Sequence, residues 1–259
     1  APPFVWLGLT VAAPLALVVA ISLGEATQGA PPFDWGFSFA NYALVLADEL
    51  YWGAFATSAR IAGTSTLVCL AIGYPMALAI VRAPPARRNL LLFLVVMPFW
   101  TSFLIRVYAW MGLLRPTGLV NSALEALGLV DAPLALIANQ FAVHLGIVYA
   151  YLPFMVLPLY ATLEKLDPAL VEAAHDLGLK PRAAFWRVTF PLSLPGVAAG
   201  ALLVFIPASG EFVIPDLLGG PDAPMVGRVL WLEFFQNRDW PVACALATTQ
   251  VEISAGTPI

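Results

Sequence analysis

Long runs of apolar residues alternate with short polar segments along this chain of 259 residues. A membrane-crossing helix needs about 20 mostly apolar residues, because each residue rises about 1.5 Å and the hydrocarbon core is about 30 Å thick. The pattern therefore predicts an all-α membrane protein, a polytopic bundle of six helices in a single transmembrane domain of residues 1–259. The predicted spans are approximately residues 4–23, 53–81, 90–114, 139–163, 192–214 and 240–253.

The two ends of this pattern are less regular than its middle. Residues 4–23 exceed the 7–15 apolar residues typical of a signal peptide, so we expect a retained helix. The last run, 240–253, has 14 residues and becomes polar from Thr248 onward, which makes it short for a crossing. Either the chain is cut or altered near its end, or this segment does not cross alone.

The polar segment of residues 164–191, between the fourth and fifth predicted spans, predicts a helix, an elbow and a second short helix. Asp167 can accept hydrogen bonds from the first free amides, and Pro168 suits the first helical position. Gly178 suits the left-handed residue that ends a helix. Three apolar residues at helical spacing are predicted to share one face: Leu170, Ala174 and Leu177.

The second short helix is predicted to run from residue 180 to residue 188, and Pro191 is expected to stop it. Two short helices held between membrane spans would form a docking surface. An ordinary solvated loop is the alternative.

Composition places most of the chain in lipid. Apolar residues make up 61% and charged residues 11%, whereas soluble domains carry about 25% charged residues. A net charge of −4 on so few charges argues against a nucleic-acid partner. Cys69 and Cys244 lack metal-binding or redox spacing, and we find no GxxxxGK[ST] phosphate-binding loop.

Basic residues predict the orientation, because cytoplasmic loops are enriched in Lys and Arg. Residues 82–89 and 164–191 together hold seven: Arg82, Arg87, Arg88, Lys165, Lys180, Arg182 and Arg187. The loops on the other side hold three: Arg115, Arg228 and Arg238. The segment 164–191 is therefore expected in the cytoplasm.

Three charged residues fall inside predicted spans: Arg60, Arg106 and Glu211. A charge at the centre of a membrane helix costs about 2.5–3.5 kcal/mol on insertion scales, so each is a functional candidate. Glu211 could contact a transported substrate, or it could pair with Arg60 or Arg106 between helices. His144 has no second ligand at metal spacing and is expected to be packed or hydrogen-bonded.

Aromatic residues crowd the third predicted span, among them Trp100, Tyr108 and Trp110. Aromatic rings near a carboxylate attract cations through the ring quadrupole and ion pairing. Helix packing and anchoring at the membrane interface are the alternative explanation.

The segment 172–191 resembles the EAA loop of bacterial ABC-importer permeases. Glu172-Ala173-Ala174 is followed by three residues, Gly178, nine residues and Val188-Thr189-Phe190-Pro191. The family pattern ends in I-x-L-P, and Val188 and Phe190 keep these positions apolar. The resemblance implies a type I (MetI-like) permease whose loop helix sits in a groove of a cytoplasmic ATPase. The implied coupling residues are Leu170, Glu172, Ala173, Ala174, Leu177, Gly178 and Pro191.

Residues 210–220 and 98–106 resemble the spermidine/putrescine branch of this permease family. The resemblance implies a path for a polyamine, with Glu211 and Asp216 facing it beside Trp100, Tyr108 and Trp110. It implies a bacterial inner-membrane subunit that binds no cofactor itself and is not an enzyme. Its implied partners are an ATPase dimer that binds ATP and Mg, a second identical or distinct permease, a periplasmic substrate-binding protein and lipid.

Two alternatives remain at this point. Permeases for another solute, such as an oxyanion or iron, share this architecture. An ion-coupled secondary transporter could use Glu211 as its coupling carboxylate, but such proteins usually contain inverted repeats and none is visible here.

Overall fold

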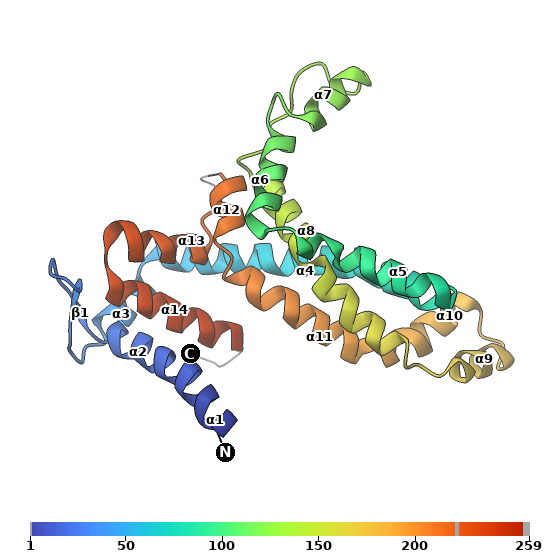
Figure 1. Ribbon diagram of the computed structural model, residues 1–259, viewed down its shortest axis with the longest axis horizontal. Helices are drawn as coiled ribbons and strands as arrows, with labels where there is room; N and C mark the ends of the chain where they lie inside the picture. The colour runs from blue at the N-terminus through green and yellow to red at the C-terminus, as the bar shows by residue number, and fades with distance from the viewer. Residues whose placement is uncertain (1, 221–222, 256–259) are drawn as a thin grey trace. The chain divides into compact units, whose positions relative to one another are not determined.

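The computed structural model describes residues 2–220 and 223–255, and helices make up most of them (Figure 1). Contacts divide the chain into two compact units. The first consists of the described residues of Ala1–Arg60, Ser209–Asp216 and Gly220–Ile259. The second consists of Ile61–Ala208 and Leu217–Gly219.

The first unit is built around its last helix. Its elements before the unit boundary are α1 (Pro2–Leu7), a π-helical turn (Gly8–Ala12), α2 (Ala13–Ser22), β1 (Glu25–Ala26), β2 (Phe33–Asp34), α3 (Ala40–Ala47) and the start of α4 (Glu49–Arg82). The later ones are α12 (Val213–Leu218, divided by the boundary), α13 (Val226–Trp231), a π-helical turn (Leu232–Asn237) and α14 (Trp240–Ala255). β1 and β2 pair antiparallel. Helix α14 packs against α2 and α3, and its Leu246 lies in a core with Val45, Phe55 and Val226.

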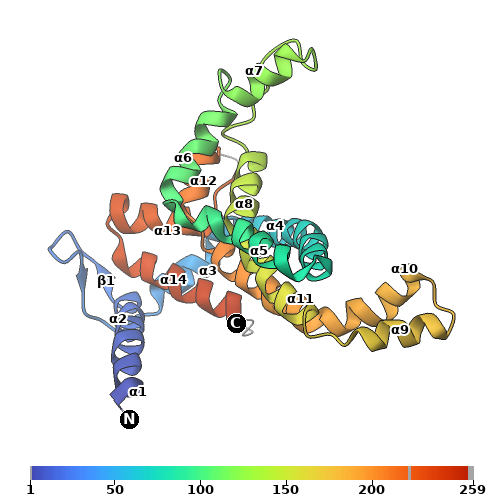
Figure 2. The same ribbon diagram turned by 45° about the vertical axis from the view of Figure 1, so that its right-hand side comes forward.

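The second unit contains the longest helices. After the remainder of α4 come α5 (Pro85–Val96), a 3-10 turn (Met97–Trp100), α6 (Phe103–Leu114), α7 (Leu119–Ala126), α8 (Gln140–Leu163), α9 (Pro168–Asp176), α10 (Pro181–Ala184), a π-helical turn (Phe185–Thr189) and α11 (Phe190–Ser209). Its core includes Met155, Leu159 and Val204. The Tyr74 hydroxyl of α4 and the Ser193 hydroxyl of α11 form a buried hydrogen bond of 2.8 Å. Figures 1 and 2 show α9 and α10 at the far end of this unit, beyond the ends of α8 and α11.

Within residues 2–220 and 223–255, four helices are long and apolar enough to cross a membrane, or five if the bent pair described below is one span: Val5–Ser22, Glu49–Arg82, Gln140–Leu163 and Pro181–Ser209. The chain is thus an all-α protein with several potential membrane spans. The predicted count of six remains a prediction, because α14 has 16 residues in the described part of the chain.

The third predicted span differs most from expectation. Instead of one helix over residues 90–114, the pair Pro85–Trp100 and Phe103–Ala126 bends by 88° at a short break (Figure 2). Pro98 cannot donate a backbone hydrogen bond, the chain tightens into a 3-10 turn, and Thr101 is extended with ψ 150°. In contrast, Pro153 and Pro158 lie inside a continuous α8. Proline in a membrane helix is tolerated where neighbouring groups satisfy the freed carbonyls.

Candidate coupling loop and charged residues

Helix α9 has the two ends that its sequence predicts. Asp167 Oδ1 accepts a hydrogen bond of 2.9 Å from the backbone N–H of Ala169, and Pro168 is the first helical residue. At the other end, Gly178 has φ +83° and its N–H donates to the His175 carbonyl at 2.8 Å. A left-handed glycine directly after the last turn closes the helix by satisfying its free carbonyls.

The apolar residues of α9 do not share one environment, contrary to the predicted common face. Ala174 is buried inside the unit, whereas Leu170 is exposed and Leu177 is 85% exposed. Leu177 sits at the end of the helix, where its backbone leaves helical geometry. Trp186, an exposed aromatic residue in the turn that follows α10, was not predicted from sequence as part of this segment's surface. Exposed apolar side chains gathered on one short segment are typical of a surface that binds a partner.

A groove of about 300 Å³ lies beside α9. Its wall from α4 includes Val81, and its wall from α9 includes Val171 and Glu172. Leu163, the last residue of α8, and Leu166, which follows the helix, also line the groove. Glu172, the acidic residue of the EAA sequence, is exposed and faces this groove. The groove therefore joins the candidate docking helix to the ends of two long helices.

The prediction that Pro191 stops the second helix of the loop is wrong. Residues Pro181–Ser209 form one continuous helical stretch through α10, the π-helical turn and α11. The π-helical turn of Phe185–Thr189 lies directly before Pro191, and the N–H of Phe190 donates to the carbonyl of Phe185. A wider turn at this point lets the helix continue past a residue that cannot donate a backbone hydrogen bond.

The two acidic residues predicted to face a substrate path both have protein partners in the first unit. Glu211 is 8% exposed, and its Oε1 accepts a hydrogen bond of 3.0 Å from the N–H of Val213, the first residue of α12. Asp216 forms an ion pair of 3.3 Å with Arg228 of α13. Arg228 could not be found from sequence as this partner, because nothing local links α12 to α13.

The third-span residues lie in the second unit. Trp100 is 76% exposed and Tyr108 is exposed, while the Trp110 ring meets Tyr149 edge to face at 5.5 Å. Arg106 donates through Nη1 to the Pro98 carbonyl, and its guanidinium carbon lies 5.1 Å from the centre of the Phe99 ring. These contacts of Arg106 therefore stabilise the break between α5 and α6.

His144 is hydrogen-bonded, as expected. Its Nε2 lies 2.7 Å from the hydroxyl of Thr64, and its Nδ1 lies 2.6 Å from the carbonyl of Gln140. Both ring nitrogens therefore have partners, and the residue fixes the start of α8 against α4.

The sequence profile of the inner membrane component of binding-protein-dependent transport systems matches residues 69–251. The chain is 42% identical over 244 residues to the spermidine/putrescine transport system permease protein PotB of Haemophilus influenzae, covering 94% of this chain and 85% of that protein. The PotB protein of Escherichia coli K12 is 43% identical over 213 residues, covering 82% of this chain and 77% of its own. The fold is also similar to that of a chain in a solved bacterial alginate ABC transporter, in complex with an alginate pentasaccharide-bound periplasmic protein. The TM-score is 0.77 at 17% sequence identity, and the match covers 98% of this chain and 88% of that chain. The protein therefore belongs to the family of inner membrane components of binding-protein-dependent transport systems.

Proposed function

We propose that this chain is a permease subunit of an ATP-driven importer that carries spermidine, putrescine or a related polyamine. The main support for a polyamine substrate is the 42% identity to a spermidine/putrescine permease over 94% of the chain. Membership of the family, together with several helices able to cross a bilayer, makes the chain a multi-pass inner membrane protein.

In this proposal α9 is the helix that docks on a separate ATPase subunit, which binds ATP and Mg. Its caps hold a short rigid helix at the end of the second unit, and Leu177 offers an apolar contact there. The basic residues of 164–191 favour a cytoplasmic location for this loop. The proposed coupling residues are Leu170, Glu172, Ala173, Ala174, Leu177, Gly178 and Pro191.

The substrate reaches the chain from an external binding protein and crosses between this subunit and a second permease. Glu211 and Asp216 supply negative charge for a polycation, and aromatic faces such as Trp100, Tyr108 and Trp110 supply cation–π contacts. Arg228 balances the charge of Asp216 in the structure, so a polycation would have to compete with Arg228 for that carboxylate. Nucleotide-driven closure of the ATPase dimer moves α9, and the spans then alternate between outward and inward access.

The test uses the complete assembly solubilised from its native membrane and reconstituted in proteoliposomes. ATP hydrolysis should be stimulated by binding protein loaded with spermidine or putrescine, and labelled spermidine should accumulate only with ATP. Stimulation by molybdate or sulfate but by neither polyamine would remove the substrate assignment. Uptake that follows a proton gradient without ATP would favour a secondary transporter.

Docking of α9 on the ATPase can be tested with a matched pair of charge-reversal variants. Glu172→Lys reverses a charge at the groove beside α9, and Glu125→Lys makes the same change on exposed α7. We expect the ATPase to be lost on purification of the first variant and retained by the second. Retention by both would contradict docking through α9.

A further inference from the structure

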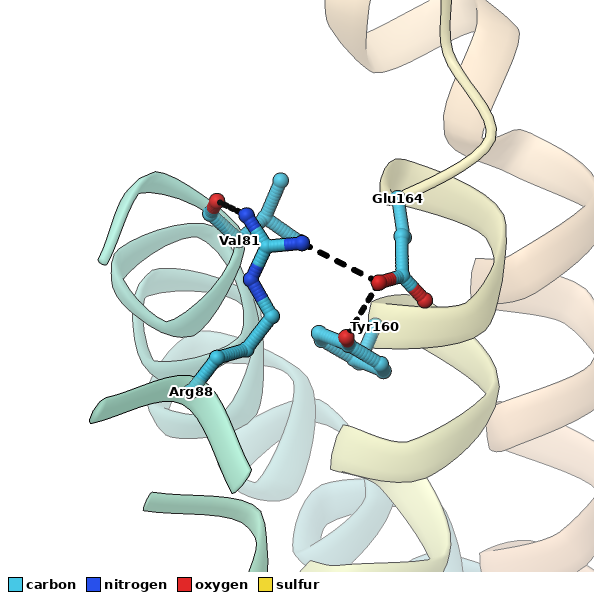
Figure 3. Close-up of polar contacts among 4 residues, drawn as sticks. All are labelled: Val81, Arg88, Tyr160 and Glu164. Atoms are coloured by element: carbon cyan, nitrogen blue, oxygen red, sulfur yellow. Dashed lines mark hydrogen bonds and ion pairs between the residues drawn. The ribbon is translucent and has the colours of Figure 1, made fainter. Parts of the chain in front are cut away.

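Arg88 joins the ends of three helices in the second unit (Figure 3). It lies in the first turns of α5, and its Nη2 donates a hydrogen bond of 2.7 Å to the carbonyl of Val81, near the end of α4. Its Nη1 donates at 3.1 Å to Oε1 of Glu164, the residue that follows α8. The same carboxylate oxygen accepts a hydrogen bond of 2.6 Å from the Tyr160 hydroxyl.

Both partners of Arg88 lie at the C-terminal ends of helices, where a positive charge is favourable. The last carbonyls of a helix have no partner within it, and the carbonyl of Val81 is one of them. Glu164 places a negative charge at the end of α8, where the helix dipole is itself negative. One guanidinium therefore satisfies a free carbonyl on α4 and neutralises an unfavourable carboxylate on α8.

The bonds of Arg88 fix the relative positions of the helix ends more than they stabilise the fold. The side chains of Arg88 and Glu164 are 26% and 43% exposed, and ion pairs with this much solvent contribute little to folding. The guanidinium is planar and its donors point in fixed directions, so two simultaneous bonds define where the three helix ends lie.

This contact also lies next to the candidate docking helix. Only Lys165 and Leu166 separate Glu164 from Asp167, which caps α9. Val81 accepts from Arg88 and also lines the groove that Glu172 faces. A displacement of α9 would therefore move Glu164 at the end of α8, and through Glu164 it would move Arg88.

We propose that Arg88 is a positioning residue that transmits movement of α9, through Glu164, to the ends of both α4 and α5. This inference rests on the proposed function, in which α9 receives the movement of an ATPase. With the contact intact, the three helix ends move together. Without it, the end of α8 follows α9 while α4 and α5 lag, and ATP is hydrolysed without import.

The test compares Arg88→Ala with Arg87→Ala in the reconstituted assembly. The second variant removes the same charge from an exposed neighbour in the same turn. For Arg88→Ala we expect the ATP hydrolysed per spermidine imported to rise about fivefold, the size of effect typical of a residue that couples two sites. Glu164→Gln should shift the ratio in the same direction, and Tyr160→Phe should shift it less. Arg87→Ala should leave it unchanged.

If Arg88 had only a structural role, the result would differ. Arg88→Ala would then lower the amount of assembled complex, measured by size-exclusion chromatography, without changing the ATP-to-spermidine ratio of the complex that remains. The charge exchange Arg88→Glu with Glu164→Arg should recover part of the lost coupling, since it restores the link to α8 but not the bond to Val81. An unchanged ratio in Arg88→Ala, or equal ratios in both arginine variants, would overturn the inference.

A second readout separates this inference from the substrate assignment. Spin labels at the exposed residues Asn89 and Lys165 report the distance between α5 and the end of α8 without any substrate. We expect one narrow distance with and without nucleotide in the parent, and a second population on nucleotide binding in Arg88→Ala. An Arg88→Ala distance that stays narrow would overturn the inference even if polyamine import is confirmed. Conversely, failure of polyamine import alone leaves this distance test decisive.

Discussion

Asp216 and Arg228 form an ion pair in which a carboxylate oxygen lies 3.3 Å from Nε of the guanidinium. The acid that the sequence suggests for attracting a cationic substrate is therefore already balanced by a base. Both side chains remain partly exposed, so solvent and salt weaken their attraction. A polycation approaching Asp216 would have to compete with Arg228.

Removal of Arg228 should make this competition visible. Arg228→Gln frees the Asp216 carboxylate, and we expect the half-saturating spermidine concentration for uptake to fall about two- to fivefold at low salt. The measurement is initial uptake against concentration, with Arg115→Gln as a control that removes one expected outer charge. An unchanged half-saturating concentration with a lower maximal rate would instead assign the pair a structural role.

The left-handed glycine that ends α9 provides a second prediction. Gly178 has φ +83°, and among the described residues no atom beyond its chain neighbours lies within 4 Å of the position that a Cβ would take, so a larger residue there meets backbone strain and not a clash. A side chain in this conformation costs about 1–2 kcal/mol. Gly178→Val should therefore loosen the end of α9 and reduce ATPase retention, whereas Gly178→Asn should be milder because Asn tolerates this conformation.

The chain contains a matched control for this change. Gly128 ends α7 with φ +66°, its Cβ position is likewise open within the described part of the chain, and its N–H donates to the Glu125 carbonyl at 2.9 Å. Gly128→Val should produce comparable local strain, seen as faster amide exchange at the end of α7, with normal ATPase retention. Equal loss of ATPase in the two Val variants would mean that retention reflects general instability.

The ends of α9 could be predicted from sequence because capping depends on neighbours within a few residues. Asp167, Pro168 and Gly178 each act on the backbone beside them, and the structure places all three as expected. The break at Thr101 was not predictable in the same way. A proline such as Pro98 can bend, break or merely tolerate a membrane helix, and the outcome depends on packing partners.

The long-range contacts could not be predicted because they join residues far apart in the chain. From sequence, Arg88 is one of several basic residues that indicate a cytoplasmic loop, and its bonds to Val81 and Glu164 depend on how α4, α5 and α8 pack. Asp216 and Arg228 are a similar case. The resemblance to the spermidine/putrescine branch implied Asp216 as a path residue, but nothing in the sequence indicated the residue that neutralises its charge.

Leu177 permits a third prediction that separates docking from folding. It is 85% exposed, so Leu177→Ser removes little packing within the chain. If α9 buries this side chain on an ATPase, the loss of its apolar area should weaken ATPase binding about tenfold. Titration of the ATPase onto detergent-solubilised permease measures the change.

Leu127 is the corresponding control, since it lies at the end of α7 directly before a left-handed glycine and is 72% exposed. Leu127→Ser should bind the ATPase like the parent. Parent-like binding by Leu177→Ser as well would exclude this leucine from the docking surface.

The crossing of α8 and α11 gives the fourth prediction, because it holds the base of the coupling loop. A Cβ on Gly196 would lie 2.6 Å from Thr162 Oγ1 and 3.0 Å from the backbone carbonyl of Pro158. Overpacking of this kind costs about 1–3 kcal/mol, so Gly196→Ala should lower the apparent melting temperature in detergent. Gly112→Ala should not lower it, because no other described residue approaches within 4 Å of the Cβ position at this helical glycine.

A double variant distinguishes this steric cause from a general intolerance of alanine at residue 196. Thr162→Ala removes the hydroxyl that lies 2.6 Å from the new methyl group of Gly196→Ala, while Thr162 Cβ at 2.8 Å and the carbonyl of Pro158 stay in place. The two changes together should therefore recover part of the melting temperature lost with Gly196→Ala alone, and part of the ATP-driven uptake if the crossing positions α9. Additive losses in the double variant would contradict a direct contact between these two positions, since residues that clash must show coupled effects.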